Sequence, residues 1–85
     1  MLDTALANLK SLHLAGHLED EHMPFLKGCS KLSWLELTRS KITDGGLLHL
    51  ETLSNLKQLR IVDSKVTDEG VRKLQQALLN CEIRH

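Results

Sequence analysis

The sequence has few of the residues on which many small domains depend. It contains no Tyr, one Trp and one Phe, so a core built around large aromatic side chains is excluded and branched aliphatic side chains must fill it. Its 11 basic and 11 acidic residues give a formal net charge of zero. Nucleic-acid and membrane-surface binders usually carry a basic excess. We therefore expect one small domain of 85 residues that binds neither nucleic acid nor membrane.

Cysteine is equally scarce. Cys29 and Cys81 lie far apart and form no Cys-x-x-Cys motif, whereas a disulfide framework needs more cysteines at closer spacing. The chain does not begin with a basic segment followed by an apolar run, as a signal peptide would. No apolar stretch approaches the roughly 20 residues that span a bilayer. We expect free, buried thiols in a cytoplasmic protein.

Leucine, by contrast, is abundant and regularly placed. The segment LKSLHL at residues 9–14 recurs as LSWLEL at 32–37 and as LKQLRI at 56–61, at offsets of 23 and 24 residues. The last two copies are followed by KITDGGL at 41–47 and KVTDEGV at 65–71. Self-similarity at this period is the signature of stacked supersecondary units.

Each repeat changes its hydrophobic period midway. Leucines alternate with polar residues at 35–37, which predicts a short strand with one buried face. Leucines recur every third residue from 47 to 53, which predicts one apolar stripe of a short helix. The Thr-Asp pairs at 43–44 and 67–68 stand where such a helix begins, and their oxygens can accept first-turn N–H groups. One strand and one helix cannot bury their own apolar faces, so about three stacked copies are needed for stability.

The pattern L-x-x-L-x-L followed by I/V-T-D-x-G-L/V resembles the leucine-rich repeat superfamily, and the resemblance covers residues 6–83. It is closest to the short T-D-x-G form of bacterial repeat proteins, which is related to F-box and ribonuclease-inhibitor repeats. The resemblance implies an α/β fold: a right-handed solenoid with short parallel strands on its concave face and short helices on its convex face. The expected single domain, 1–85, divides into the tail of a preceding helix (1–8), repeats at 9–31, 32–55 and 56–80, and a closing strand at 81–85.

Two features depart from the pattern of the family. Ser40, Ser64 and, approximately, His17 stand where the family has Asn, Thr or Cys, whose side chains bond the turns of adjacent coils. Serine does this less completely, so we expect looser turns. Pro24 falls near the fourth position of the first helix, where a backbone N–H is normally wanted. We expect that helix to be short or shifted.

The two ends of the chain lead to different expectations. Residues 1–8 lack a polar cap, so the chain is expected to begin mid-repeat and to leave the strand near residues 10–14 with an open edge. Either a longer parent protein precedes this edge, or a partner covers it, or the chain associates with itself there. At the other end we expect Cys81 and Ile83 to point inward and the charged residues 82 and 84 to point outward, which discourages further stacking.

Outward positions on the strands follow from their alternation. We expect one column of Ser11, Trp34 and Gln58, and a second of His13, Glu36 and Arg60, extended by Glu82. Lateral ion pairs of Glu36 with its neighbours, and of Arg39 with Asp63, explain the charges without a ligand. Trp34 is the sole tryptophan, and Trp and Arg dominate interface hot spots. The alternative is a Trp34 ring lying flat over its neighbours. The candidate partner-binding residues are Trp34, His13, Glu36, Arg39, Gln58 and Arg60.

Candidates for catalysis are weak. His17 and His22 are separated by four residues, a spacing that does not align two imidazoles one helical turn apart. Gly45-Gly46 lacks the lysine of a phosphate-binding loop. We therefore expect no metal, cofactor or catalytic residue, and a protein-protein interaction module and not an enzyme. The alternative is a structural C-terminal capping segment of a longer repeat protein, with no binding site of its own.

Overall fold

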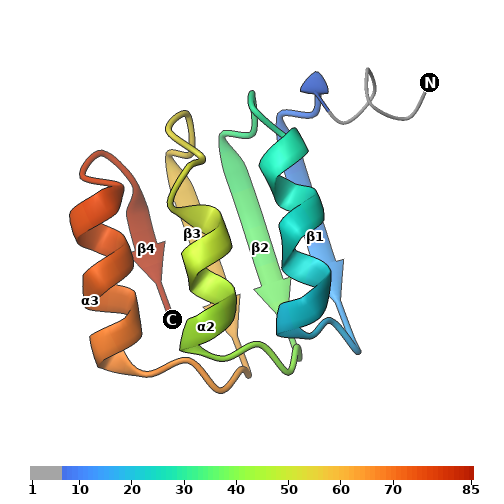
Figure 1. The fold of residues 1–85 in the computed structure, drawn as a ribbon, viewed down its shortest axis with the longest axis vertical. Helices are drawn as coiled ribbons and strands as arrows, with labels where there is room; N and C mark the ends of the chain where they lie inside the picture. The colour runs from blue at the N-terminus through green and yellow to red at the C-terminus, as the bar shows by residue number, and fades with distance from the viewer. Residues whose placement is uncertain (1–6) are drawn as a thin grey trace.

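A computed structural model describes residues 7–85 of the chain, which form a single parallel sheet covered by helices. The sheet has four strands in the order β1-β2-β3-β4, shown in Figure 1. The strands are β1 (Ser11–Ala15), β2 (Trp34–Thr38), β3 (Gln58–Val62) and β4 (Glu82–Arg84). Leu12, Leu35 and Leu59 are register partners. The predicted equivalence of the three leucine motifs is therefore confirmed.

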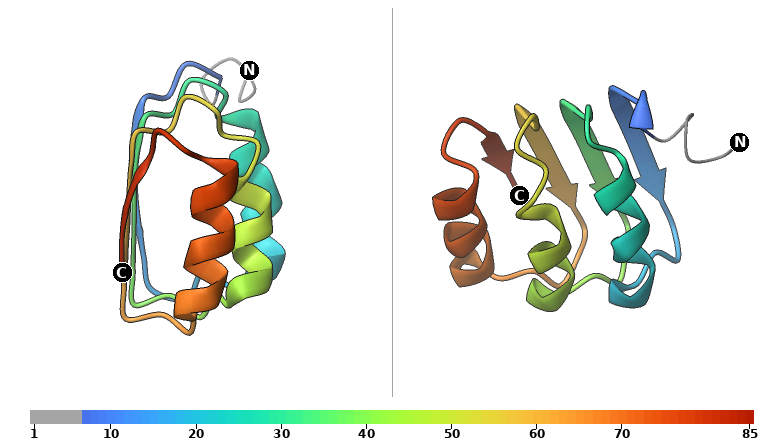
Figure 2. Two further views of the ribbon diagram at one scale, coloured as in Figure 1. Left: turned by 90° about the vertical axis from the view of Figure 1, so that its left-hand side faces the viewer. Right: turned by 45° about the horizontal axis from the view of Figure 1, so that its top comes forward.

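The helical segments form a second layer on one face of the sheet. They are the 3-10 helix η1 (Asp20–Gly28), the helix α2 (Asp44–Leu47), continued by the 3-10 turn η2 (Leu48–Leu50), and α3 (Asp68–Ala77). Seen along the sheet, strands and helices of successive repeats superpose, and the second sheet face carries no helix of the described range (Figure 2). We call each strand with the helical segment that follows it a coil.

The core lies between the two layers and is aliphatic, as predicted. The side chains of Leu35, Leu37 and Leu50 are fully buried, and Cys29 occupies a buried position of the same kind in the first coil. Burial of a leucine side chain stabilises a fold by about 1.5–3 kcal/mol. Because the side chains that meet come from neighbouring coils, stability depends on the stacking of copies.

The helix of the first coil differs from the others in type. η1 is a 3-10 helix of nine residues with Pro24 inside it. Of the two expectations, a short or a shifted helix, the first is therefore wrong. A 3-10 run of this length is uncommon, and Pro24, which has no N–H to donate, lies at its centre. The imidazole Nδ1 of His22 accepts a hydrogen bond from the Glu19 N–H at 3.0 Å, which accounts for this histidine as part of the helix start.

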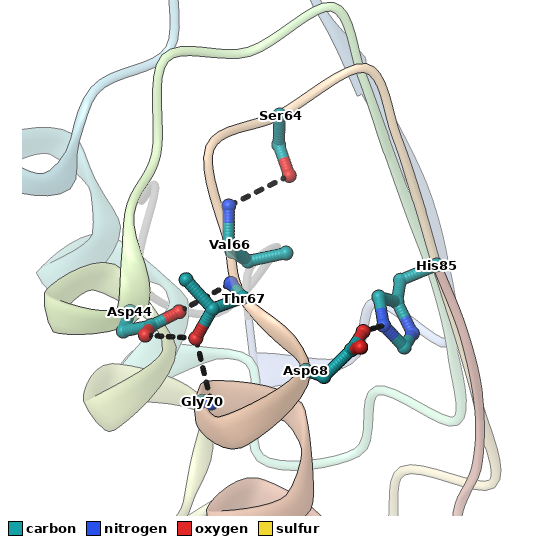
Figure 3. A network of polar contacts seen from close by, with 7 residues as sticks. All are labelled: Asp44, Ser64, Val66, Thr67, Asp68, Gly70 and His85. Carbon is teal, nitrogen blue, oxygen red and sulfur yellow. Dashed lines mark hydrogen bonds and ion pairs between the residues drawn. The ribbon is translucent and has the colours of Figure 1, made fainter.

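An aspartate of each of the first two coils reaches across to the threonine of the next coil. Asp20 accepts the backbone N–H of Thr43 at 2.8 Å and its hydroxyl at 2.5 Å. Asp44 accepts the same two groups of Thr67 at 2.8 and 2.6 Å, as Figure 3 shows. We call these two pairs the carboxylate ladder. Charge-assisted hydrogen bonds of this kind are about twice as strong as neutral ones.

The two threonines of the ladder, Thr43 and Thr67, also cap the helices that follow them. The Thr43 hydroxyl oxygen accepts a hydrogen bond from the Gly45 N–H at 3.2 Å. The Thr67 hydroxyl oxygen accepts one from the Gly70 N–H at 3.1 Å. Thr43 and Thr67 are the N-cap residues of α2 and α3, so the predicted capping role is confirmed. Each hydroxyl thus donates to the preceding coil and accepts from its own helix.

The glycine of the T-D-x-G motif leaves room for the ladder. A Cβ atom at Gly46 would overlap the carboxylate of Asp20, and one at Gly70 would overlap that of Asp44. The neighbouring Gly45 has no such constraint, because a Cβ there meets its nearest atoms at 3.5 and 3.6 Å. The motif therefore encodes a contact between coils as well as a helix start.

The third aspartate of the series has a different partner. Asp68 lies 2.7 Å from the imidazole Nε2 of His85, which follows β4.

The ladder also affects the acidity of Asp44. The hydrogen bond from the Thr67 hydroxyl lowers the pKa of the Asp44 carboxyl most, and the hydrogen bond from the Thr67 backbone N–H lowers it further.

The serines of the turns behave unequally. Ser40 is only 6% exposed, and its hydroxyl has no hydrogen-bond partner within the described residues. The equivalent Ser64 accepts the N–H of Val66 at 3.3 Å. The expectation that serine satisfies these turns incompletely is thus met at Ser40. The expectation for the N-terminal helix tail falls mostly on residues 1–6, outside the described range.

Adjacent glycines of α2 give a matched test of the ladder. Gly46→Ala should destabilise the fold by about 1–3 kcal/mol, as overpacking does. Gly45→Ala should be neutral or stabilise by roughly 0.5–1 kcal/mol, since alanine is favoured over glycine in a helix. Urea unfolding followed by circular dichroism measures both. Equal effects of the two substitutions would contradict the role assigned to Gly46.

The Asp44 carboxylate should make stability depend on pH. Because its folded-state pKa lies below that of the unfolded chain, its stabilisation is fully present above about pH 4 and is lost as pH falls through the folded-state value. Asp44→Asn should therefore be less stable than wild type at pH 7, with the gap narrowing toward pH 3 in urea unfolding. Glu51→Gln, outside the ladder, is the control; a pH-independent gap for Asp44→Asn would refute the assignment.

Candidate functional site

The sheet face opposite the helices is the candidate functional surface, and we call it the open face. Alternate residues of each strand project onto it, while the residues between them are buried or half-buried. The strand register arranges these side chains in columns. The first column is Ser11, Trp34, Gln58 and Glu82, and the second is His13, Glu36, Arg60 and Arg84.

The register corrects one prediction. Glu82 pairs with Gln58 and therefore extends the column of Trp34; Arg84 is the residue that extends the column of Arg60. The inward direction of Cys81 and Ile83 is confirmed by their burial. The 24-residue offset from Trp34 to Gln58, applied once more, leads to Glu82. The repeat period was thus the signal that could have placed both charged residues of β4.

A shallow hollow lies on the open face over β2, β3 and β4. Its volume is about 220 Å³, below the roughly 300–1,000 Å³ of small-molecule pockets. A second hollow of about 440 Å³ follows it toward the carboxyl ends of β3 and β4 and shares Arg60 and Arg84 with it. The first hollow is lined by Trp34, Gln58, Leu59, Arg60, Glu82 and Arg84. Its lining is mostly polar and charged, which suits a protein surface better than a buried small molecule.

Charges on the open face are paired unequally. Glu36 lies 3.8 Å from the His13 imidazole, whose Nε2 is also 3.2 Å from the Thr38 hydroxyl. In β4 the guanidinium of Arg84 donates to the Glu82 carboxylate at 3.0 and 2.7 Å. Arg60 forms no ion pair with any residue in the range 7–85. The predicted pairing of Glu36 with Arg60 is therefore wrong, although the two are register neighbours.

The six predicted binding residues fall into three groups. Trp34, Gln58 and Arg60 line the first hollow together. His13 and Glu36 form a pair beside it, on β1 and β2. Arg39 lies past the end of β2 with a φ of 51°, exposed and outside both hollows; no ion pair joins it to Asp63 among the described residues. Leu59, Glu82 and Arg84 belong to the hollow but were not predicted as site residues.

Metal-ligating side chains and cysteine thiols form no reactive site within residues 7–85. The described part of the chain holds no cluster of three or more metal-ligating side chains, and none of its helices is long and apolar enough to cross a membrane. Both cysteines are free and buried. Burial raises the pKa of the Cys29 and Cys81 thiols, and the nearby Glu82 carboxylate raises that of Cys81 further. Neither thiol is activated as a nucleophile.

Comparison with known families and structures identifies the repeat. A family model described as leucine-rich repeat matches residues 52–74, which contain β3 and the first turns of α3. This segment is therefore similar to a leucine-rich repeat. A leucine-rich repeat protein of Leptospira interrogans superposes with a TM-score of 0.61 and 22% sequence identity over 88% of this chain, a likeness that shows the fold. The chain spans 25% of that protein's length. A comparison with curated proteins found no match.

The buried thiols of Cys29 and Cys81 should react only when the fold opens. A disulfide reagent at pH 7.5 should modify native Cys29 and Cys81 about a hundredfold or more slower than in denaturant. Absorbance of the released thiolate measures the rate, and Ser54→Cys supplies an exposed reference thiol. Native reaction at the rate of the reference would contradict the burial and raised pKa of both groups.

Proposed function

We propose that the open face is a binding surface for a protein partner, centred on Trp34. Leucine-rich repeat proteins in general act as protein-interaction modules and non-enzymatic scaffolds, and in a longer array this face would line the concave side. Support comes from one observation: the sole tryptophan stands on the second of four strands, at the rim of a polar hollow that also holds Arg60. Buried aromatic and arginine anchors supply most of the energy of protein interfaces.

The half-burial of Trp34 suits this role. Trp34 is neither fully buried nor fully exposed, so part of its side chain stays accessible to a partner. A tryptophan side chain has only two rotatable bonds, so it loses little conformational entropy on binding. Large rigid aromatics are effective contacts for this reason.

A second function is favoured by a different observation. Asp68 occupies the ladder position that Asp20 and Asp44 use to bind the next coil, but it contacts His85 instead. His85, which follows β4, thus occupies the carboxylate at the start of α3. This favours the alternative proposal of a capping segment in a longer leucine-rich repeat protein, for which the chain's 25% coverage of the Leptospira protein is further support.

The two proposals differ in their consequences for association. A self-sufficient binding module is monomeric, whereas a segment that needs a preceding coil associates through β1, as we propose for the alternative. Sedimentation of the purified chain, which measures its oligomeric state, separates the two proposals.

We also propose a cytoplasmic location for the protein. The two free thiols support it, because disulfides are rare in a reducing compartment.

Trp34→Ala tests the binding proposal directly. Loss of an interface anchor costs about 2 kcal/mol or more, so partner affinity should fall roughly 30-fold or more with little change in the circular dichroism spectrum. Quantitative pull-down from a lysate, followed by affinity measurement with the captured protein, gives this ratio. Phe25→Ala is the matched control, because Phe25 is an exposed aromatic residue in the helical layer. A partner retained at full affinity by Trp34→Ala would remove the proposal.

A further inference from the structure

We propose that the hollow beside Trp34 receives the carboxylate of an aspartate or glutamate from the protein partner, held between Arg60 and Arg84. This inference rests on the proposed binding function of the open face and names the chemistry that the partner presents. The carboxylate would occupy the space over β3 and β4 that both arginines line.

The register brings the two arginines side by side. Arg60 of β3 and Arg84 of β4 are Cα partners of adjacent parallel strands, and both project onto the open face. Neighbouring strands lie about 4.8 Å apart, and like charges in lateral positions repel each other. An anion between the two guanidinium groups relieves this repulsion.

The hollow already holds an example of the interaction. Arg84 donates from both Nε and Nη2 to one oxygen of the Glu82 carboxylate, at 3.0 and 2.7 Å. Glu36, the other carboxylate of the face, lies beside His13 at 3.8 Å. Arg60 is consequently left, within the described residues, as the open-face arginine without an anion. A guanidinium is well shaped for a carboxylate, which it can bind through two parallel hydrogen bonds.

Trp34 would strengthen the binding of a carboxylate to the neighbouring Arg60. Both side chains line the same hollow, and Trp34 is the diagonal neighbour of Arg60, since the register partner of Trp34 is Gln58. A partner chain that covers the tryptophan would exclude water from the adjacent guanidinium. Removal of water strengthens a charge-assisted hydrogen bond.

The surrounding charges favour a single carboxylate over a polyanion. Glu82 lies in the hollow and Glu36 beside it, so the phosphates of a nucleic acid would meet two carboxylates for every two arginines. The chain as a whole has no net charge to attract a polyanion. An isolated acidic side chain on a protein surface meets neither difficulty.

A peptide-display selection tests the inference. Random peptides are selected on the wild-type chain and depleted on Trp34→Ala, and the survivors are synthesised with each Asp or Glu replaced by its amide. We expect each open-face peptide to contain one acidic residue whose replacement lowers affinity about tenfold or more for the wild-type chain. The same replacement should change affinity less than twofold for Arg60→Gln. Fluorescence anisotropy gives these ratios.

Two further variants sharpen the result. Arg72→Gln removes an exposed arginine of α3, in the helical layer, and should keep the full tenfold dependence on the acidic residue. Glu82→Gln removes the competing carboxylate and should raise the affinity of the acidic peptides several-fold. A fall in affinity with Glu82→Gln would overturn the inference.

Failure of the inference and failure of the proposed function give different results. Peptides that depend on Trp34 but not on an acidic residue, or whose acidic dependence persists in Arg60→Gln, would overturn the carboxylate site and leave the binding face standing. A selection that yields no Trp34-dependent peptide would overturn both. Circular dichroism of each variant confirms that binding is compared between folded chains.

Discussion

The fold depends on how one coil is fixed to the next, and the carboxylate ladder is a contact that does this where the helices begin. Asp20 and Asp44 each hold both the N–H and the hydroxyl of a threonine one coil later. Since that threonine also caps the next helix, the start of each helix is tied to the coil before it. Strand pairing fixes the opposite side of each coil, so the two layers advance together.

The open face inherits its geometry from this stacking. A parallel register without slips places every outward side chain beside its equivalent in the next coil, which brings Trp34 next to Gln58 and Arg60 next to Arg84. The chemistry of the face then depends on which residue each repeat carries at a shared position. Repeated coils with variable outward residues give a binding surface whose scaffold does not change with its specificity.

The sequence predicts most of this architecture and part of the candidate site. Strands and columns could be predicted because the leucine alternation recurs at a nearly constant offset. The ladder was missed because Asp44, beside a helix start, is sufficiently explained by the helix dipole, and its partner Thr67 lies 23 residues away. Glu82 was placed in the wrong column because β4 contains no leucine to align.

Hydrogen exchange at the backbone amides of Thr43 and Thr67 is the most direct test of the stacking contact. Both residues are exposed, and their N–H groups are bonded to the aspartate of the preceding coil. The account predicts that both amides are protected to about the same degree as those in the centre of β2 and β3, and that Asp44→Ala removes protection at Thr67 while leaving Thr43 protected. Rapid exchange of both amides in the native chain would contradict it.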